Sequence, residues 1–224
     1  MLLKLSELLN AAQLDKMQSL LADAEFVDGR LTAGFAAAKV KHNQEMRQDP
    51  KRMQLLIRIL IASLSHNEQF RFGALPHRVA DPIFARYQPG MAYGDHVDDP
   101  IMGSSGPRFR TDVSMTIFLN PPEAYDGGEL VIRTSFGGRK VKLPAGDAVM
   151  YPSSSLHRVA EVTRGERLVA LTWVQSYVRD PARRELLYEL NQARELLLRQ
   201  APDADETGLL DRSYSNLVRM WSEL

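Results

Sequence analysis

The hydrophobic positions of the chain follow a helical period near both ends and a strand period between them. Residues 11–22 place leucine and methionine side chains at helical spacing, which predicts a short amphipathic helix. A second helix is expected after Asp49, because Asp49 is a suitable N-cap and Pro50 suits the first helical position. The apolar positions of this second helix are Met53, Leu56, Ile57, Leu60, Ile61 and Leu64.

In the middle of the chain the apolar residues come in short runs that are separated by Gly, Pro and Asp. Runs of this length and spacing are typical of strands in a sandwich or barrel, here of the double-stranded β-helix or jelly-roll type. The runs are IFARY, MAYGDHV, VSMTIFL, GELVIR, GRKVKL, DAVMY, HRVAEV and RLVALTWVQSYV.

The last part of the chain turns helical again. Asp180 and Pro181 repeat the N-cap and first-turn signature, and an apolar stripe follows them. The stretch APDADETG, residues 201–208, predicts a polar loop before a last helix that contains Tyr214 and Trp221. The apolar stripe consists of Leu186, Leu187, Leu190, Ala193 and Leu197.

These patterns predict an α+β fold with a mainly β core. Helices in residues 1–77 would support the core, residues 78–178 would form the jelly roll, and residues 179–224 would form a C-terminal helical extension. The helical extension could also bury its apolar stripe against a second subunit and so form a homodimer.

Composition narrows the function classes. The 28 basic residues balance the 28 acidic ones, so no overall field favours nucleic acid or an anionic membrane as a partner. The absence of Cys excludes a disulfide scaffold, a thiolate nucleophile and a Cys-based zinc site. Lys4 and Glu7 interrupt the apolar N-terminus, and Arg58 interrupts the apolar stretch LLIRILIASL. We therefore expect a soluble, cytoplasmic protein.

Three residues provide the strongest chemical signal. In a strand, alternate side chains share a face, so His96 and Asp98 should point one way while Asp95 and Asp99 point the other. With His157 from a distant strand, the pair would make a 2-His-1-carboxylate facial triad. Such a triad binds one face of an iron and leaves the opposite face open.

Arg167 is the fourth candidate. It begins an apolar strand whose alternate positions Val169, Leu171, Trp173 and Gln175 share its face. An arginine in such surroundings needs an anionic partner, and the guanidinium fork suits a carboxylate. That partner could be a ligand.

With these motifs the sequence resembles the iron(II)- and 2-oxoglutarate-dependent dioxygenases of the prolyl-4-hydroxylase-like group, and more closely the bacterial PKHD-type hydroxylases. The resemblance runs from about residue 78 to 178 and continues in the helical ending SNLVRMWSEL. It implies hydroxylation of a small-molecule or peptide substrate with release of succinate and CO2, ascorbate as a reductant, and a role linked to iron uptake.

The resemblance also implies roles for individual residues. His96, Asp98 and His157 take the positions of the iron ligands, and Arg167 takes the position that binds the distal carboxylate of 2-oxoglutarate. Trp173 falls where the family often has a tryptophan near the metal.

One position departs from the wider group. Where animal members have a tyrosine that assists the basic residue, this chain has Phe118, which cannot donate a hydrogen bond. Ser114, Thr116 or Tyr87 would then have to assist Arg167, and the sequence does not choose among them.

Two other function classes stay open from the residues alone. A non-catalytic cupin-like protein would keep the three metal ligands, but it would have no need of Arg167. A zinc hydrolase would need a general base near the metal-bound water, and strand alternation directs Asp95 and Asp99 away from it.

Several charged or titratable residues are expected to be structural or solvated. They are His42, His66 and His77, which lie outside any ligand spacing, Arg164 in a turn, and Arg108 and Arg110 in a loop that could alternatively meet an anionic substrate.

Overall fold

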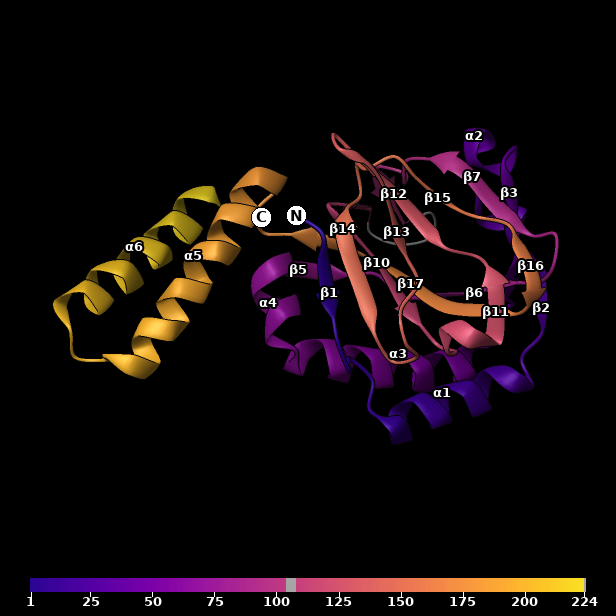
Figure 1. The fold of residues 1–224 in the computed structure, drawn as a ribbon, viewed down its shortest axis with the longest axis horizontal. Coiled ribbons are helices and arrows are strands. Elements are labelled where there is room, and N and C mark those ends of the chain that lie inside the picture. The colour runs from indigo at the N-terminus through magenta and orange to yellow at the C-terminus, as the bar shows by residue number, and fades with distance from the viewer. Residues whose placement is uncertain (104–107, 224) are drawn as a thin grey trace.

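Two antiparallel sheets face each other and form the expected jelly roll. The structure is a computed structural model, and it describes residues 1–103 and 108–223. The larger sheet runs β1-β14-β10-β17-β6-β4-β2, with β5 also paired to β17, and the smaller sheet runs β13-β12-β15-β7-β3 (Figure 1). Two short ribbons, β8 with β9 and β11 with β16, join them.

The bounds of the strands follow the chain. The larger sheet contains β1 Leu3–Leu5, β2 Phe26–Asp28, β4 Gln44–Met46, β5 Pro76–Val79, β6 Ile83–Tyr87, β10 Val113–Phe118, β14 Ala148–Pro152 and β17 Arg167–Ser176. The smaller sheet contains β3 Lys41–His42, β7 Ala92–His96, β12 Leu130–Thr134, β13 Gly137–Val141 and β15 His157–Val159. The ribbons contain β8 Ile101–Met102, β9 Phe109–Arg110, β11 Tyr125–Gly127 and β16 Val162–Gly165.

All eight apolar runs form strands, as predicted. The N-terminal segment contributes more than the helices expected of it, because β1 to β4 add to both sheets. These strands have only two or three residues each, and so short a strand shows no period in the sequence. Two of them carry residues to the wall of the cavity described below.

Helices cover one face of the larger sheet. α1 Ala11–Ala22 and α3 Pro50–His66 begin where the sequence predicts, with Asn10 and Asp49 as their N-caps. Their buried faces pack with residues of β10, β14 and β17 in one hydrophobic cluster (Figure 1). The shorter elements α2 Phe35–Ala38, α4 Glu68–Ala74, η1 Gly29–Thr32 and η2 Pro122–Ala124 were not predicted.

The C-terminal extension is a helical hairpin of α5 Pro181–Gln200 and α6 Asp205–Trp221, and it projects away from the sheets (Figure 1). Asp180 caps α5 as predicted. The predicted loop over 201–208 is too long, because α6 already begins at Asp205, where acidic residues in the first turn favour a helix N-terminus. Within the described residues, every helix is too short or too polar to cross a bilayer.

Candidate active site

A cavity of about 490 Å³ lies between the two sheets. The smaller sheet supplies His96 and His157 to the wall of the cavity, and the segment that follows β7 supplies Asp98. The larger sheet supplies Arg167 and Trp173. The N-terminal segment closes another side with residues near β3 and β4. The sequence-predicted residues therefore meet in one space, although they come from separate strands.

The predicted metal ligands form a compact cluster at one end of this cavity. His96 ends β7 and His157 begins β15, and the two residues are direct cross-strand partners. One ligand atom from each of His96, Asp98 and His157 can be chosen so that all three lie within 4.8 Å of one another. Atoms this close can bind a single metal ion.

Asp98 reaches the cluster for a reason other than strand alternation. β7 ends at His96, so Asp98 lies beyond the strand. The Ser114 hydroxyl donates to Oδ2 of Asp98 at 2.5 Å, while Oδ1 lies 3.9 Å from Nε2 of His157. One carboxylate oxygen is thus held by the protein, and the other faces the histidines.

Backbone carbonyls orient both imidazoles. Nδ1 of His96 lies 2.8 Å from the Gly94 carbonyl, and Nδ1 of His157 lies 3.0 Å from the Ser155 carbonyl. A carbonyl only accepts, so each Nδ1 carries the proton and each Nε2 is left with a free lone pair. The two rings therefore present metal-binding nitrogens to the cavity.

Burial keeps His96 ready for a metal. Desolvation, followed by the neighbouring His157, lowers the pKa of His96 to about 4. Tyr93 stacks on the His96 ring with the centroids 3.5 Å apart, which limits rotation of the ring. At neutral pH His96 is therefore a neutral imidazole, which is a donor that Fe(II) accepts.

The opposite end of the cavity holds a buried charge without a counter-ion. Arg167 is 1% exposed, and neither its Nε nor its Nη1 has a hydrogen-bond partner. Its guanidinium lies 5.0 Å from the Tyr87 ring centroid and 5.7 Å from that of Phe118. Burial of an unpaired charge is costly, and a carboxylate ligand would supply the missing acceptor.

Further buried polar atoms near Arg167, and one on Trp173 farther along β17, also lack a partner. Tyr87 is its cross-strand partner, and the pairing of β4 with β6 brings Asn43 beside Tyr87. Burial raises the pKa of Tyr87 to about 12, so its hydroxyl keeps a proton to donate. Among the described residues, the buried side-chain atoms without a partner are Asn43 Nδ2 and Oδ1, Tyr125 Oη, Arg167 Nε and Nη1, and Trp173 Nε1.

Asn43 and Tyr125 were missed by the sequence reasoning. Asn43 lies between two very short strands, and Tyr125 begins a ribbon, so neither stands in a periodic pattern. Burial raises the pKa of Tyr125, although the nearby positive charge of Arg167 acts to lower it. Strand pairings between distant parts of the sequence bring both residues near Arg167, β4 with β6 for Asn43 and β11 with β16 for Tyr125.

The other predicted pocket residues occupy different parts of the cavity. Ser114 bonds to Asp98 and Ser153 at the metal end. Thr116 lines the cavity beside Tyr151, whose pKa burial raises well above its usual value. Trp173 lies opposite Ser114 in the pairing of β10 with β17, and its Nε1 is one of the unpaired atoms. Of the three residues suggested to assist Arg167, Tyr87 lies against it.

The acidic residues that flank the triad lie away from its ligand atoms. Asp95 points outward and pairs with Arg133 at 2.6 Å. Asp99 is exposed at the cavity wall, and its backbone carbonyl accepts from the Thr111 hydroxyl at 2.6 Å. Alternation thus describes Asp95 correctly, whereas Asp99 lies past the end of the strand and lines the cavity.

Two of the arginines predicted to be solvated have partners. Arg164 is exposed, as predicted, but pairs with Asp126 at 2.7 Å across the β11–β16 ribbon. Arg110 is only partly exposed and pairs with Asp112 at 2.7 Å, so its assignment to a solvated loop was wrong. Arg108 lines the cavity, and residues 104–107 of the same predicted loop lie outside the described residues. His42, His66 and His77 lie outside the triad.

Comparison with known families gives two matches. The profile described as the 2OG-Fe(II) oxygenase superfamily matches residues 82–175, which hold the triad and Arg167. The profile described as the PKHD-type hydroxylase C-terminal domain matches residues 181–223, the helical hairpin.

Full-length relatives are similar to this chain. A PKHD-type hydroxylase of Thioalkalivibrio sulfidiphilus is 54% identical over 224 residues, and one of Synechococcus elongatus is 46% identical over 223 residues. In both comparisons 100% of each chain is covered.

Solved structures share the fold. A Pseudomonas putida prolyl-4-hydroxylase has a TM-score of 0.56 at 22% identity, with 78% of this chain and 92% of that chain covered. A Trichoplax adhaerens prolyl hydroxylase bound to a peptide fragment has a TM-score of 0.55 at 14% identity, covering 83% and 86%. HygX from Streptomyces hygroscopicus, solved with nickel and 2-oxoglutarate, has a TM-score of 0.52 at 15% identity, covering 79% and 84%.

Proposed function

The chain belongs to the PKHD-type hydroxylases within the 2OG-Fe(II) oxygenase superfamily and is an oxygenase, and on that premise we propose how its residues divide the work. His96, Asp98 and His157 bind Fe(II), and Arg167 binds the distal carboxylate of 2-oxoglutarate. The reaction hydroxylates a C–H bond of an organic substrate and releases succinate and CO2. Family membership decides against the non-catalytic cupin-like protein and the zinc hydrolase.

The unpaired guanidinium of Arg167 carries this proposal. If the cavity bound only a metal, the buried guanidinium of Arg167 would have no anionic partner. A dicarboxylate that binds the metal at one end can pair with Arg167 at the other, because both line the same cavity. Carboxylates pair with arginine through two parallel hydrogen bonds, and such pairs fix orientation as well as affinity.

The protein's own contribution is binding, orientation and the exclusion of water. When bound, iron with 2-oxoglutarate and dioxygen supplies the oxidising power for the reaction. His96 and His157 hold the metal through Nε2, and Ser114 keeps one oxygen of Asp98 turned toward it. The buried aromatic rings of Tyr87 and Phe118 keep water from the guanidinium of Arg167.

Tyr87 is our choice among the residues suggested to assist Arg167. Its protonated hydroxyl and the Asn43 amide can donate to the same carboxylate, because the three residues lie in one row across neighbouring strands. Thr116 and Trp173 line the same cavity, and Trp173 has a free Nε1 donor that a ligand near the metal could use.

The substrate we propose is a small molecule or a peptide. Structural neighbours include a prolyl hydroxylase solved with a peptide fragment and HygX solved with nickel and 2-oxoglutarate. Ascorbate as reductant, a cytoplasmic location, a homodimer through the C-terminal helices and a link to iron uptake complete the proposal. They follow from the family resemblance and the sequence patterns.

An anaerobic titration tests the metal and co-substrate roles. Fe(II) and 2-oxoglutarate together should give a weak metal-to-ligand charge-transfer band, and calorimetry should show that 2-oxoglutarate binds. Absence of both would refute the proposed site. Hydrolytic activity with zinc that does not depend on 2-oxoglutarate would instead support the zinc hydrolase. Succinate release, screened over candidate small molecules and peptides, would then identify the substrate class.

A further inference from the structure

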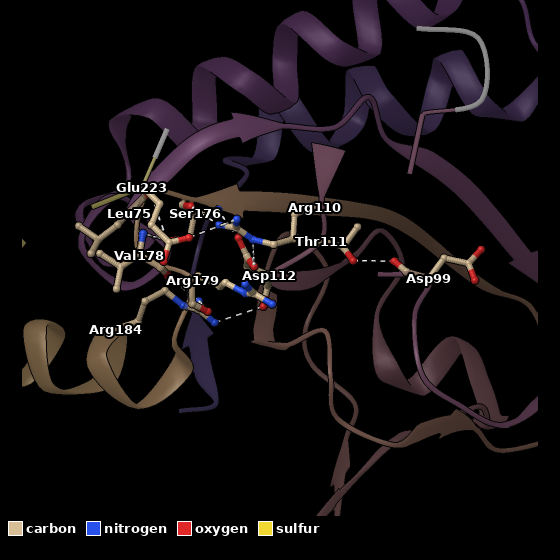
Figure 2. Close-up of polar contacts among 10 residues, drawn as sticks. All are labelled: Leu75, Asp99, Arg110, Thr111, Asp112, Ser176, Val178, Arg179, Arg184 and Glu223. Atoms are coloured by element: carbon tan, nitrogen blue, oxygen red, sulfur yellow. Dashed lines mark hydrogen bonds and ion pairs between the residues drawn. The ribbon is translucent and has the colours of Figure 1, made fainter. Parts of the chain in front are cut away.

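A buried arginine anchors the C-terminal hairpin to the jelly roll. Arg184, in the first turn of α5, is 3% exposed. Its Nη1 donates to the carbonyls of Val178 at 2.7 Å and Arg179 at 2.8 Å, and its Nη2 donates to the carbonyl of Asp112 at 3.2 Å (Figure 2). The charge from the extension thus enters the core and contacts the start of β10.

Asp112 is fixed from several sides. Its carboxylate accepts from Nε of Arg110 at 2.7 Å and from the backbone N–H of Ser176 at 2.9 Å (Figure 2). Arg110 also pairs with Glu223, just after α6, at 3.5 Å. Both the beginning and the end of the hairpin therefore converge on Asp112.

A series of hydrogen bonds connects Asp112 to the candidate metal ligand Asp98. The carbonyl of Asp112 accepts from the backbone N–H of Ser153 at 3.1 Å. The Ser153 hydroxyl lies 2.7 Å from that of Ser114, which donates to Asp98. Ser114 has a single hydroxyl proton, so when that proton points to Asp98, Ser153 donates to Ser114.

The preceding residue holds the same part of the chain. The Thr111 hydroxyl donates to the carbonyl of Asp99 at 2.6 Å (Figure 2). The backbone N–H of Thr111 donates to the carbonyl of Pro100 at 3.0 Å. Since Asp98 lies beyond the end of β7, no strand pairing fixes it. Its position depends on these contacts from residues 111–114.

We propose that the C-terminal hairpin sets the geometry of the carboxylate ligand, with Arg184 as a remote positioning residue that acts on Asp98 through Asp112, Ser153 and Ser114. The inference rests on the proposed role of Asp98 as a metal ligand. Neighbours of a ligand that orient it are worth about 10–100-fold in metal affinity. The helical hairpin is then part of the metal site, although it touches no ligand.

Metal affinity of the apoprotein is the test, because it needs no turnover. Anaerobic Co(II) titration, followed by the d–d absorption of the bound ion, gives both the Kd and a signature of ligand geometry. Ser114→Ala should weaken binding by about 10–100-fold, and Ser153→Ala and Arg184→Met by about tenfold or less, each with a shifted d–d spectrum. Arg184→Lys, which can donate to some of the same carbonyls, should recover part of the loss.

A double-mutant cycle separates positioning from general destabilisation. In a Ser114→Ala background, Arg184→Met should cost little further metal affinity, because the connection to Asp98 is already cut. Arg194→Met is the matched control, since Arg194 pairs with Asp211 inside the hairpin at 2.6 Å. It should keep the parent Kd and spectrum even if it lowers the free energy of unfolding.

Each result decides between the alternatives. Additive losses in the double variant, or an equal loss in Arg194→Met, would overturn the proposal and leave Arg184 a merely structural residue. If Arg184→Met does not fold, Arg184→Lys and Ser153→Ala carry the same cycle. A parent protein that binds no Co(II) or Fe(II) would refute the proposed metal site itself, whereas a parent that binds metal and a Ser114→Ala variant that binds it equally well would refute only this inference.

Discussion

The two ends of the cavity satisfy their polar groups in opposite ways. At the metal end, His96 and His157 each donate to a backbone carbonyl, and Asp98 accepts from Ser114. At the other end, Arg167 and Asn43 are buried with unpaired atoms. The first end is oriented by the protein, and the second is completed only when an anion enters.

This difference assigns different work to each end. A buried polar group without a partner costs about 1–3 kcal/mol, and a ligand that pairs it recovers this free energy on binding. We therefore expect co-substrate affinity to come mainly from the Arg167 end, while the metal end contributes a fixed geometry. Substitutions at the two ends should separate these effects.

The largest effect is expected at the metal ligands. His96→Ala, Asp98→Ala and His157→Ala should each abolish Fe(II) binding or nearly so, because each loses a bond and the facial geometry. Metal analysis of the anaerobically loaded proteins measures it. Asp99→Ala should retain one iron per chain, because Asp99 is exposed and outside the triad. Stoichiometric iron in Asp98→Ala would count against the assignment.

The next largest effect is expected at Arg167. Arg167→Ala should leave iron binding intact and raise the required 2-oxoglutarate concentration more than a hundredfold, since a buried carboxylate without its partner costs about 3–5 kcal/mol. Arg167→Lys should recover only part of the loss, because a point charge replaces a bidentate fork. Arg164→Ala, which removes an exposed ion pair, is the control and should change little. An unchanged concentration dependence in Arg167→Ala would place the co-substrate elsewhere.

The same arginine should have the opposite effect on the ligand-free fold. Arg167→Met removes a buried unpaired charge and keeps an apolar side chain of similar length, so the free energy of unfolding should rise by about 1–4 kcal/mol. Urea denaturation without 2-oxoglutarate measures it. Saturating 2-oxoglutarate should stabilise the parent and not the variant. A less stable Arg167→Met apoprotein would mean that the unliganded end is not strained by its charge.

Tyr87→Phe is expected to have a smaller effect. Loss of one hydrogen bond to a charged group costs about 1.5–3 kcal/mol, so the 2-oxoglutarate requirement should rise at least about tenfold with iron binding unchanged. Calorimetry with Fe(II) present measures it. Tyr188→Phe, a buried tyrosine on α5 outside the cavity, is the matched control. Equal affinity in both variants would turn attention to Asn43 and Tyr125.

The sequence reasoning succeeded where a pattern was long or chemically rare. α3 and α5 begin at their predicted caps, α1 covers the predicted residues 11–22, and the eight apolar runs are strands. His96, His157 and Arg167 meet in one cavity because each stands on a recognisable strand. Asp98 was placed correctly by an alternation that does not extend to it, since β7 ends two residues earlier.

The contacts that the sequence did not reveal depend on long-range pairing. Asn43 joins the cavity only because β4 pairs with β6.

The sequence also did not distinguish two adjacent arginines at the start of α5, Arg183 and Arg184. Arg183 is exposed while Arg184 is buried and bonded to three carbonyls, although both follow Pro181 in the same turn. Only the docking of the hairpin on the core decides which arginine turns inward.

The smallest predicted effect is on the pH dependence of the free energy of unfolding of the apoprotein, which should differ between the two ends of the cavity. The folded state lowers the pKa of His96 from 6.5 to about 4, so the unfolded chain binds more protons between these values. The contribution of a neutral His96 is therefore complete above pH 6.5 and is lost as the pH falls toward 4. Urea denaturation at several pH values should give a shallower slope for His96→Phe than for the parent. Arg167→Met should keep the parent slope, because a guanidinium stays charged throughout this range. Parallel curves for His96→Phe and the parent would show that the metal end is not held neutral by burial, and the contrast between the two ends would then lose its electrostatic part.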